Sequence, residues 1–226
     1  MQVTEIYRSI QGESSFAGLP CIFVRLTGCN LRCHWCDSEY TFSGGNRMSL
    51  DEVLREIDRL GTVKLVEITG GEPMLQAREV VPLMEQLLAL DYQVLLETSG
   101  ERPLDRVPAQ VVKIVDVKCP HSGEADTFRV SNLKTLNPQD ELKFVISDRL
   151  DYEFARDFFH EHQLRVQVRN VIFSPAFHKN AQGTRDASHC MVDPRELAEW
   201  ILEDELPVRL GLQIHKFIWQ PEMKGV

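Results

Sequence analysis

The chain has 226 residues, of which 43% are hydrophobic, and its formal net charge at pH 7 is −9. That length is enough for one large domain or two small ones with a substantial hydrophobic core. The negative charge argues against direct binding to nucleic acid, because a sequence-independent binder has to neutralise phosphates. The sequence contains no apolar run of membrane-spanning length, and residues 1–13 lack the basic and apolar regions of a signal peptide. We therefore expect a cytoplasmic protein without a membrane partner.

The predicted elements alternate between strands and helices along the chain. Residues 21–27 (CIFVRLT) are a compact apolar run that predicts a first buried strand, ending at Gly28. Ser49 is expected to cap a helix over residues 50–60, because Glu52 stands three positions later and completes a capping box. Further strands are predicted over residues 65–69, 94–96, 111–117, 142–146, 166–173 and 208–214, and further helices over residues 79–90, 150–160 and 194–203.

This alternation predicts an α/β fold of about six parallel strands with interspersed helices. A closed barrel of this kind needs eight strands, so we expect a partial, open TIM-like barrel. The sequence shows no repeat, low-complexity segment or interdomain linker, and only residues 181–188 have the composition of a mobile loop. We therefore predict that residues 1–226 form a single domain.

The residues with chemical potential fall where the predicted strands end. A cysteine-rich loop follows the first strand, residues 70–73 (GGEP) the second, Thr98 and Ser99 the third, and residues 116–118 (DVK) the fourth. The carboxyl ends of parallel strands meet at one edge of the sheet, where such folds gather their reactive groups. The sequence therefore predicts one site at this edge.

Three of the six cysteines lie close together in the loop CNLRCHWCD, as Cys29, Cys33 and Cys36. Thiolates are soft ligands suited to zinc or to an iron–sulfur cluster. A structural zinc site needs a fourth ligand, for which His34 and Cys21 are candidates. An iron–sulfur cluster held by three cysteines leaves one iron open for chemistry, and unligated thiols are the third alternative.

The spacing C-x3-C-x2-C, with Trp35 before the last cysteine and GGEP one strand later, resembles the signature of the radical S-adenosylmethionine superfamily. The resemblance implies a [4Fe-4S] cluster on the three cysteines, with the amino and carboxylate groups of S-adenosylmethionine on the fourth iron. The cofactor would supply the radical chemistry, and the protein the placement. The cofactor-binding residues implied in this way are Trp35, Cys36, Asp37, Gly71, Asp116, Lys118 and Ser174.

The N-terminal motif IQGE, an arginine four residues before the first cysteine, and the C-D-S that ends the cysteine motif narrow the choice within that superfamily. Together they resemble the 7-carboxy-7-deazaguanine synthase family over nearly the whole chain. The resemblance implies a carbon–nitrogen lyase that converts 6-carboxy-5,6,7,8-tetrahydropterin into 7-carboxy-7-deazaguanine, a step toward queuosine and related 7-deazapurines. The hydrogen is abstracted, the ring contracts and ammonia is lost.

The same resemblance assigns residues and partners. It implies a Mg²⁺ ion on Ser38, a homodimer, and a flavodoxin or ferredoxin as electron donor. Arg25 would pair with the pterin carboxylate, although a buried ion pair is its alternative role. The substrate-binding residues implied are Ile10, Gln11, Gly12, Arg25, Thr69, His215 and Pro221.

The sequence departs from the family pattern at two places. Family members often end near the position of Pro221 with a carboxylate close to the substrate, but here residues 222–226 follow. Ser14 stands where glycine is usual, and a backbone that needs a positive φ would be strained there. Two other functions compete with the synthase: an activating enzyme of a glycyl-radical system, and a non-enzymatic binding domain stabilised by zinc.

Overall fold

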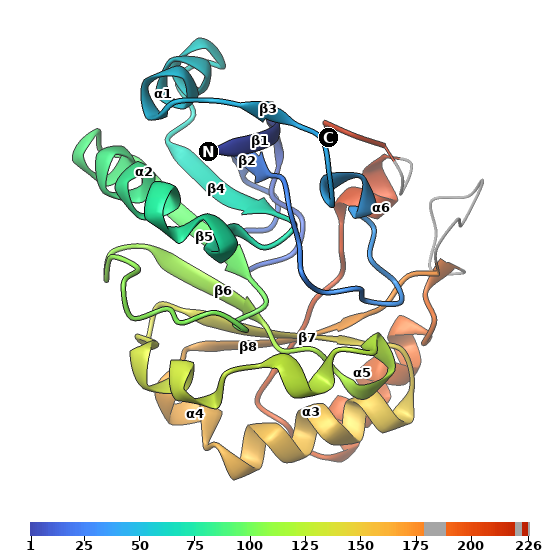
Figure 1. The fold of residues 1–226 in the computed structure, drawn as a ribbon. Helices are drawn as coiled ribbons and strands as arrows, with labels where there is room; N and C mark the ends of the chain where they lie inside the picture. The colour runs from blue at the N-terminus through green and yellow to red at the C-terminus, as the bar shows by residue number, and fades with distance from the viewer. Residues whose placement is uncertain (179–188, 220–222, 226) are drawn as a thin grey trace.

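The computed structural model describes residues 1–178, 189–219 and 223–225, and in them one sheet of nine strands runs in the order β3-β1-β2-β4-β5-β6-β7-β8-β9 (Figure 1). Residues 181–188, predicted as a mobile loop, and Pro221 lie outside the described residues. The strands are β1 (Gln2–Ile10), β2 (Pro20–Leu26), β3 (Asn46–Arg47), β4 (Leu65–Gly70), β5 (Gln93–Thr98), β6 (Val112–Asp116), β7 (Glu141–Ile146), β8 (Asn170–Pro175) and β9 (Arg209–Leu210).

Strands β2 and β4 to β9 are parallel, whereas β1 lies antiparallel to β2, and β3 antiparallel to β1. Six of the parallel strands have five residues or more, and β9 has two. The sheet is curved but not closed, since β3 and β9 are its two ends. The partial, open barrel predicted from the alternation of elements is therefore confirmed.

Helices cover the outer side of this curved sheet (Figure 1). They are α1 (Leu50–Arg59), α2 (Ala77–Ala89), α3 (Arg149–Glu161), α4 (Leu164–Gln167) and α5 (Pro194–Glu203). The short helix α6 (His215–Ile218) does not belong to this outer layer and lies near the C-terminal end of the chain (Figure 1). The predicted capping box starts α1, because the Ser49 side chain accepts from the N–H of Glu52 and the Glu52 side chain accepts from the N–H of Ser49. Asp193 caps α5, where its side chain accepts from the N–H of Arg195.

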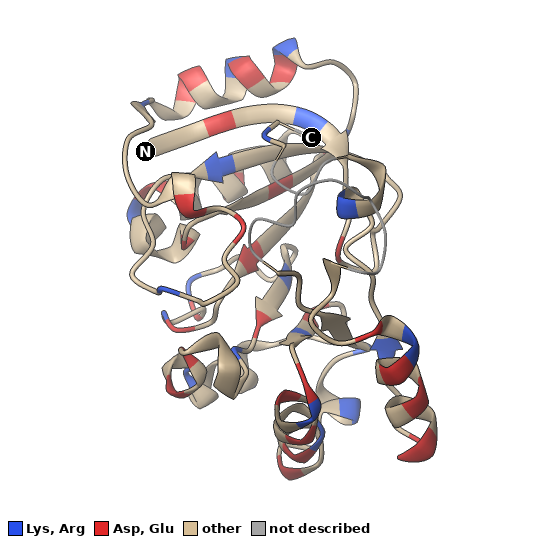
Figure 2. Cartoon of the chain, turned by 90° about the vertical axis from the view of Figure 1, so that its right-hand side faces the viewer, with Lys and Arg blue, Asp and Glu red and all other residues tan. Residues whose placement is uncertain are grey.

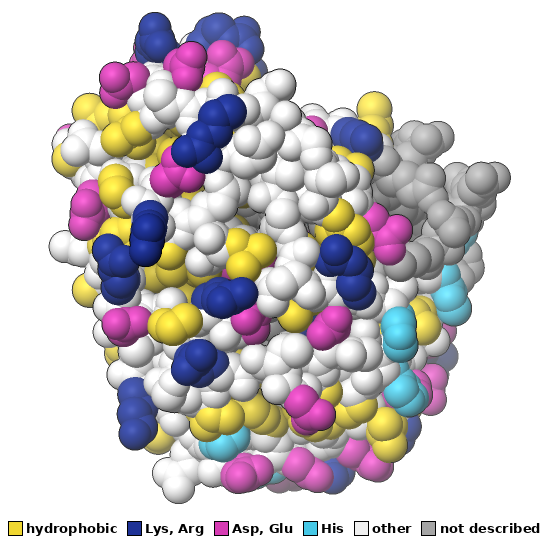
Figure 3. Space-filling model, viewed as in Figure 1, with side chains coloured by type: hydrophobic (Ala, Val, Ile, Leu, Met, Phe, Trp, Pro, Cys, Tyr) yellow, Lys and Arg dark blue, Asp and Glu magenta, His cyan; other side chains and the backbone are white. Residues whose placement is uncertain are grey.

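The hydrophobic core lies between these helices and the sheet. Val53 and Ile57 on α1 and Leu83 on α2 are fully buried and belong to one apolar cluster with the strand residues Val24 and Ile68. On the face drawn in Figure 3, Lys and Arg side chains are interspersed with Asp and Glu side chains. The charges on this face are thus mixed in sign. Among the described residues no helix is both long and apolar enough to cross a membrane.

Two predicted strands differ from the structure. Residues 166–173 are not one strand, because α4 occupies Leu164–Gln167 and β8 begins only at Asn170. Val166, the first residue of the predicted strand, is exposed, whereas Leu164 just before it is fully buried, so this turn of the chain buries Leu164 through a helix and not Val166 through a strand. The strand predicted over residues 208–214 is reduced to β9, which lies at the end of the sheet and has one neighbour, β8.

Strand β1 was not predicted from the sequence. This strand pairs along the whole of β2, with Tyr7 opposite Phe23 and Ile10 opposite Pro20. Among its residues only Val3 is buried. Since most of its side chains are only partly buried, β1 lacks the apolar run by which the central strands were recognised.

Candidate active site

A cavity of about 1440 Å³, which includes its open mouth, lies at the carboxyl ends of the parallel strands. The end of β1, the cysteine loop, the ends of β4 to β6 and the segment 213–216 contribute to its wall. Of the predicted residues, Ser174 does not line this cavity. Those that do are Ile10, Gln11, Gly12, Arg25, Cys29, Cys33, Trp35, Cys36, Asp37, Ser38, Thr69, Gly71, Asp116, Lys118 and His215.

The cysteine loop is fixed against the turn that follows β4. The N–H of Glu72 donates to the carbonyl of Gly28 (2.8 Å), and a Cβ placed on Gly71 would lie 2.2 Å from the same oxygen. Only glycine allows the two loops to approach so closely. The glycine pair of GGEP and Cys29 are thereby held side by side at the edge of the sheet.

The donor set fits an iron–sulfur cluster better than zinc. Among the described residues, the Sγ atoms of Cys29, Cys33 and Cys36 do not all lie within 4.8 Å of one another. Tetrahedral zinc would hold its thiolates roughly 3.8 Å apart, given Zn–S bonds of about 2.3 Å. His34, a candidate fourth ligand, places its Nδ1 2.8 Å from the carbonyl of His121. Burial raises the pKa of Cys33 to about 11, so this thiol keeps its proton until a metal displaces it.

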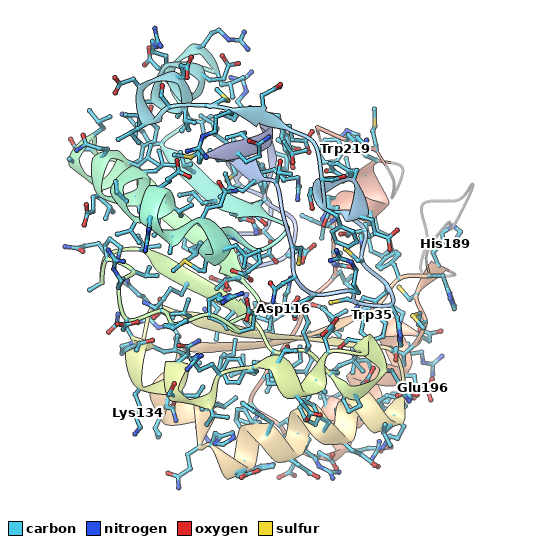
Figure 4. The ribbon with its side chains drawn as sticks, viewed as in Figure 1. Trp35, Asp116, Lys134, His189, Glu196 and Trp219 are labelled. Atoms are coloured by element: carbon cyan, nitrogen blue, oxygen red, sulfur yellow. The ribbon has the colours of Figure 1, made fainter. Side chains whose placement is uncertain are left out.

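A buried polar atom on the wall of the cavity marks where the cofactor would bind. Asp116 ends β6 at the centre of the curved sheet (Figure 4), and its Oδ2 accepts from the Nζ of Lys118 at 2.8 Å. Asp116 Oδ1 and Ser174 Oγ have no hydrogen-bond partner among the described residues. Buried polar atoms are rarely left unpaired, and Asp116 lines the cavity, so its Oδ1 indicates a polar ligand that is not part of the chain, whereas Ser174 lies outside the cavity lining. Trp35, on the cysteine loop, lines the same cavity.

Glu72 joins the ends of two strands, a role that the sequence analysis did not assign. Its Oε1 accepts from the Oγ1 of Thr98 (2.7 Å) and the N–H of Met74 (2.9 Å). Its Oε2 accepts from the N–H (2.8 Å) and the Oγ (2.7 Å) of Ser99. The acidic residue of GGEP therefore fixes the end of β5 against the end of β4.

Arg25 on β2 combines the two roles that the sequence left open. Its Nε donates to Glu5 (3.0 Å) and its Nη2 donates to the hydroxyl of Tyr7 (2.6 Å). Glu5 also accepts from the hydroxyl of Tyr40 at 2.7 Å. Arg25 is thus ion-paired, yet it lines the cavity, and its Nη1 has no hydrogen-bond partner among the described residues.

Gln11 holds the turn between β1 and β2. Its Oε1 accepts from the N–H groups of Glu13 (3.0 Å) and Ser14 (3.1 Å), and its Nε2 donates to Oε2 of Glu67 (3.0 Å). Both ends of its side chain are engaged within the protein. Ser14 is not among the residues with a positive φ, so serine at this position causes no backbone strain.

A network of buried charges lies behind this turn. The Nζ of Lys143 lies 2.5 Å from Oε2 of Glu13, 2.6 Å from Oε1 of Glu97 and 3.6 Å from Oδ2 of Asp116. Burial opposes the charge on Lys143, but these carboxylates raise its pKa well above the usual value. Burial would raise the pKa of Glu13, yet Lys143 and His215 lower it to about 2.

Neither Glu97 nor Lys143 was singled out from the sequence. The sequence feature that could have identified them is a charged residue inside an apolar strand, as in the segments LLET and ELKFVI. Parallel strands buried on both faces are otherwise apolar, so such residues point to an internal polar site. Figure 2 shows acidic and basic positions on the strands of the sheet as well as on the outer helices.

The segment that follows β9 closes the remaining side of the cavity. Gln213 donates from Nε2 to Glu13 (2.9 Å), and the Nε2 of His215 lies 3.7 Å from the same carboxylate. Lys216 pairs with Asp37 of the cysteine loop at 2.8 Å. Burial lowers the pKa of His215 and outweighs Glu13, so its imidazole is neutral at neutral pH.

The proposed magnesium ligand and the end of the chain also lie at this cavity. Ser38 lines it, with its Oγ 3.8 Å from the Sγ of Cys36. Met223 and Gly225 line it as well, and the Nζ of Lys224 lies 4.3 Å from the ring centre of Tyr40. Described residues beyond Pro221 therefore reach the site.

An open parallel barrel with three cysteines and a glycine-rich turn at its carboxyl edge defines the class of radical S-adenosylmethionine enzymes, and residues 23–119 match the model of the Radical SAM superfamily. The chain is 69% identical to the 7-carboxy-7-deazaguanine synthase of Koribacter versatilis (strain Ellin345) over 226 residues, all of both chains. It is 40% identical to that of Chlorobaculum tepidum, over 100% of this chain and 97% of the relative. The chain therefore belongs to the 7-carboxy-7-deazaguanine synthase family.

The solved structures agree on the fold. The crystal structure of QueE from Escherichia coli matches with a TM-score of 0.72 and 23% identity, over 93% of this chain and 92% of that one. The family resemblance seen in the sequence is thus confirmed, as are a lyase of the radical S-adenosylmethionine class, a small-molecule substrate, and the cofactors [4Fe-4S], S-adenosylmethionine and Mg²⁺. A glycyl-radical activase and a zinc-stabilised binding domain are set aside.

Proposed function

We propose that this chain converts 6-carboxy-5,6,7,8-tetrahydropterin into 7-carboxy-7-deazaguanine inside the cavity described above. The observation that carries the proposal is that a single cavity is lined both by the three cysteines and, through Arg25 and Gly12, by groups suited to a carboxylated heterocycle. Radical generation and substrate recognition therefore share one cavity.

The cofactor end lies at the cysteine loop. When bound there, the cluster and S-adenosylmethionine supply one-electron chemistry that removes a hydrogen atom from carbon. Cys29, Cys33 and Cys36 hold the cluster. Asp116 offers its unpaired Oδ1 to S-adenosylmethionine, and Lys118 holds the other oxygen of that carboxylate from 2.8 Å. The cofactor-binding roles of Trp35, Asp37, Gly71 and Ser174 belong to the same proposal.

The substrate end lies where β1 and β2 meet. Arg25 offers Nη1 to the substrate carboxylate, and Ser38 would supply a hydroxyl ligand to a Mg²⁺ ion. The backbone of Ile10 and Gly12, with the neutral imidazole of His215, contacts the ring. Thr69 completes the wall. The role of Pro221 rests on the family resemblance alone.

The domain organisation, the oligomeric state, the electron donor and the location are also proposed from the family resemblance. We propose a single domain over residues 1–226, a homodimer, a flavodoxin or ferredoxin as electron donor, and a cytoplasmic location. Sedimentation of the purified protein should give twice the monomer mass. A sedimenting species of monomer mass would contradict the dimer.

Anaerobic turnover tests the proposed reaction. Reconstituted protein is incubated with the carboxylated pterin, S-adenosylmethionine, Mg²⁺ and a reductant, and we expect 7-carboxy-7-deazaguanine as product. Cys33→Ala should lose both the cluster and product formation. Cys21→Ala removes a thiol that is buried on β2 outside the cavity, and should keep its iron and sulfide. Iron-loaded protein that leaves the pterin unchanged would contradict the proposal.

A further inference from the structure

Glu67 is a buried carboxyl group that none of the roles above uses. It lies in the middle of β4 with 2% of its surface exposed, and it lines the cavity. Thr69, the predicted substrate contact, lies two positions later on the same strand and therefore on the same face. Glu67 accordingly forms the deeper wall of the substrate end.

The hydrogen bonds around Gln11 fix how Glu67 is presented. Because Oε1 of Gln11 accepts from two backbone N–H groups, its amide nitrogen has to be the end that meets Glu67. Oε2 of Glu67 is therefore the acceptor of this bond, at 3.0 Å. No described residue hydrogen-bonds Oε1 of Glu67, which leaves this atom for a bound molecule.

The charged groups nearest to Glu67 include two carboxylates, which accept hydrogen bonds. Glu97 on β5 and Glu13 in the turn after β1 are both paired with Lys143 on β7, so the ammonium is already shared between them. Tyr7 on β1 and Cys21 on β2 also face Glu67. Burial and the neighbouring Glu97 raise the pKa of Glu67 to about 8. At neutral pH its free oxygen therefore carries a proton.

We propose that Glu67 is a substrate-binding residue whose Oε1 hydroxyl donates a hydrogen bond to the ring carbonyl at the deep edge of the heterocycle. This inference rests on the proposed function and deepens it. The pyrimidine ring of such a pterin presents N–H and amino donors together with one carbonyl acceptor. The carboxylates of Glu13 and Glu97 suit the donors, whereas the carbonyl needs a donor, which a neutral carboxylic acid provides.

The depth of Glu67 agrees with this role. Arg25 pairs in register with Thr69, whereas Glu67 pairs with Phe23, two residues earlier on each strand. At a rise of about 3.3 Å per residue, Glu67 lies about 7 Å deeper than the level of Arg25. That separation suits a fused two-ring heterocycle whose carboxylate is held at Arg25 and whose far edge reaches Glu67.

Two substitutions separate a neutral donor from a carboxylate acceptor. Glu67→Gln keeps an acceptor for Gln11 and places an N–H donor where the hydroxyl was. We expect it to keep the wild-type KM within about twofold at pH 7. Glu67→Leu fills a similar volume without a donor, and should raise the KM about tenfold with little change in kcat.

The pH dependence gives a second measurement. Above about pH 8 wild-type Glu67 loses its proton and its donor, so the KM should rise there, whereas the KM of Glu67→Gln should not share this rise. Burial raises the pKa of Tyr7 to about 12 and also raises the pKa of Cys21, whereas the pKa of Glu13 is lowered to about 2, so none of these groups ionises near pH 8. Titration of the substrate affects both proteins equally.

The experiment measures KM and kcat anaerobically from pH 6 to 9 on cluster-loaded protein, and the dissociation constant of the pterin without reductant. Glu101→Gln, at a partly buried glutamate paired with Arg102 outside the cavity, is the matched control and should behave as wild type. A Glu67→Gln variant as impaired at pH 7 as Glu67→Leu overturns the inference, as does an unchanged KM in Glu67→Leu. If the wild type itself forms no product, the proposed function falls as well.

Discussion

Single side chains at this site are held by partners that also limit their freedom. Arg25 contributes two of its nitrogens to Glu5 and Tyr7, so its planar group is already oriented before substrate arrives. Lys143 is likewise fixed between Glu13 and Glu97. Burying such charges is costly unless they are paired, and the pairing observed here compensates for that cost while setting the geometry.

Arg25→Ala tests the first of these groups. Loss of a charge-assisted bond to the substrate carboxylate should raise the KM by about tenfold to a hundredfold, with iron and sulfide content unchanged. Arg8→Ala is the matched control, because Arg8 is an exposed arginine on the neighbouring strand that donates to the carbonyl of Leu60. Loss of the cluster in the Arg25 variant would contradict the role given to it.

Two segments from opposite ends of the chain meet at the substrate end. The N–H of Ile214 donates to the carbonyl of Gly12 at 3.0 Å, and Gln213 donates to Glu13. A Cβ on Gly12 would lie 2.3 Å from Nδ1 of His215. The turn after β1 therefore positions the C-terminal segment through backbone contact, and glycine is required for the close approach.

Gly12→Ala should displace His215 and lower kcat/KM by about tenfold or more, because one of the two has to move. The test is a double-mutant cycle with His215→Ala, measured as kcat/KM at equal iron content. Once the imidazole is removed, only the Cβ of residue 215, at 3.1 Å, remains close to the added methyl group, so Gly12→Ala should cost much less in that background. Equal losses in both backgrounds would show that the clash is not the cause.

At the scale of the whole molecule, the functional groups lie at two levels of one open barrel. The cluster loop lies at the rim, whereas the network of Glu67, Glu97 and Lys143 lies within the strands. The helices on the outer side supply an apolar core, which allows the inner face of the sheet to carry charge. This arrangement makes the stability of the protein dependent on the protonation of a buried acid.

The free energy of unfolding should reveal that dependence. The pKa of Glu67 is raised from its usual 4.5 to about 8 in the folded protein, so between these values the folded state binds a proton that the unfolded state lacks. Stability of the wild type should therefore fall, relative to Glu67→Gln, as the pH rises from about 4.5 to about 8, by at most about 1.4 kcal/mol per pH unit.

Thermal melting under nitrogen, at equal cluster content, measures this difference. Each kcal/mol corresponds to about 2 to 4 °C in Tm for a protein of this size. The gap between the two proteins should widen up to about pH 8 and then stay constant. A gap that does not change with pH would mean that Glu67 is already ionised in the folded protein at low pH.

The sequence by itself determined the local features of this protein. The capping box at Ser49 and the glycine-rich turn after β4 are contained within a few residues, and the cysteine spacing identifies the class because three ligands to one cluster sit in one loop. The alternation of apolar strands and amphipathic helices likewise predicted the open barrel, since burial imposes that pattern on each element separately.

Only the tertiary structure decided which side chains share the interior of the barrel. Lys143 contacts Glu13, which is 130 residues away in the sequence, and Glu97, which is 46 residues away, so a local sequence pattern predicts neither contact. The same holds for β1, whose partly buried side chains carry little apolar signal until it pairs with β2. Contacts between distant segments depend on how the strands are ordered in the sheet, and that order follows from packing of the whole chain.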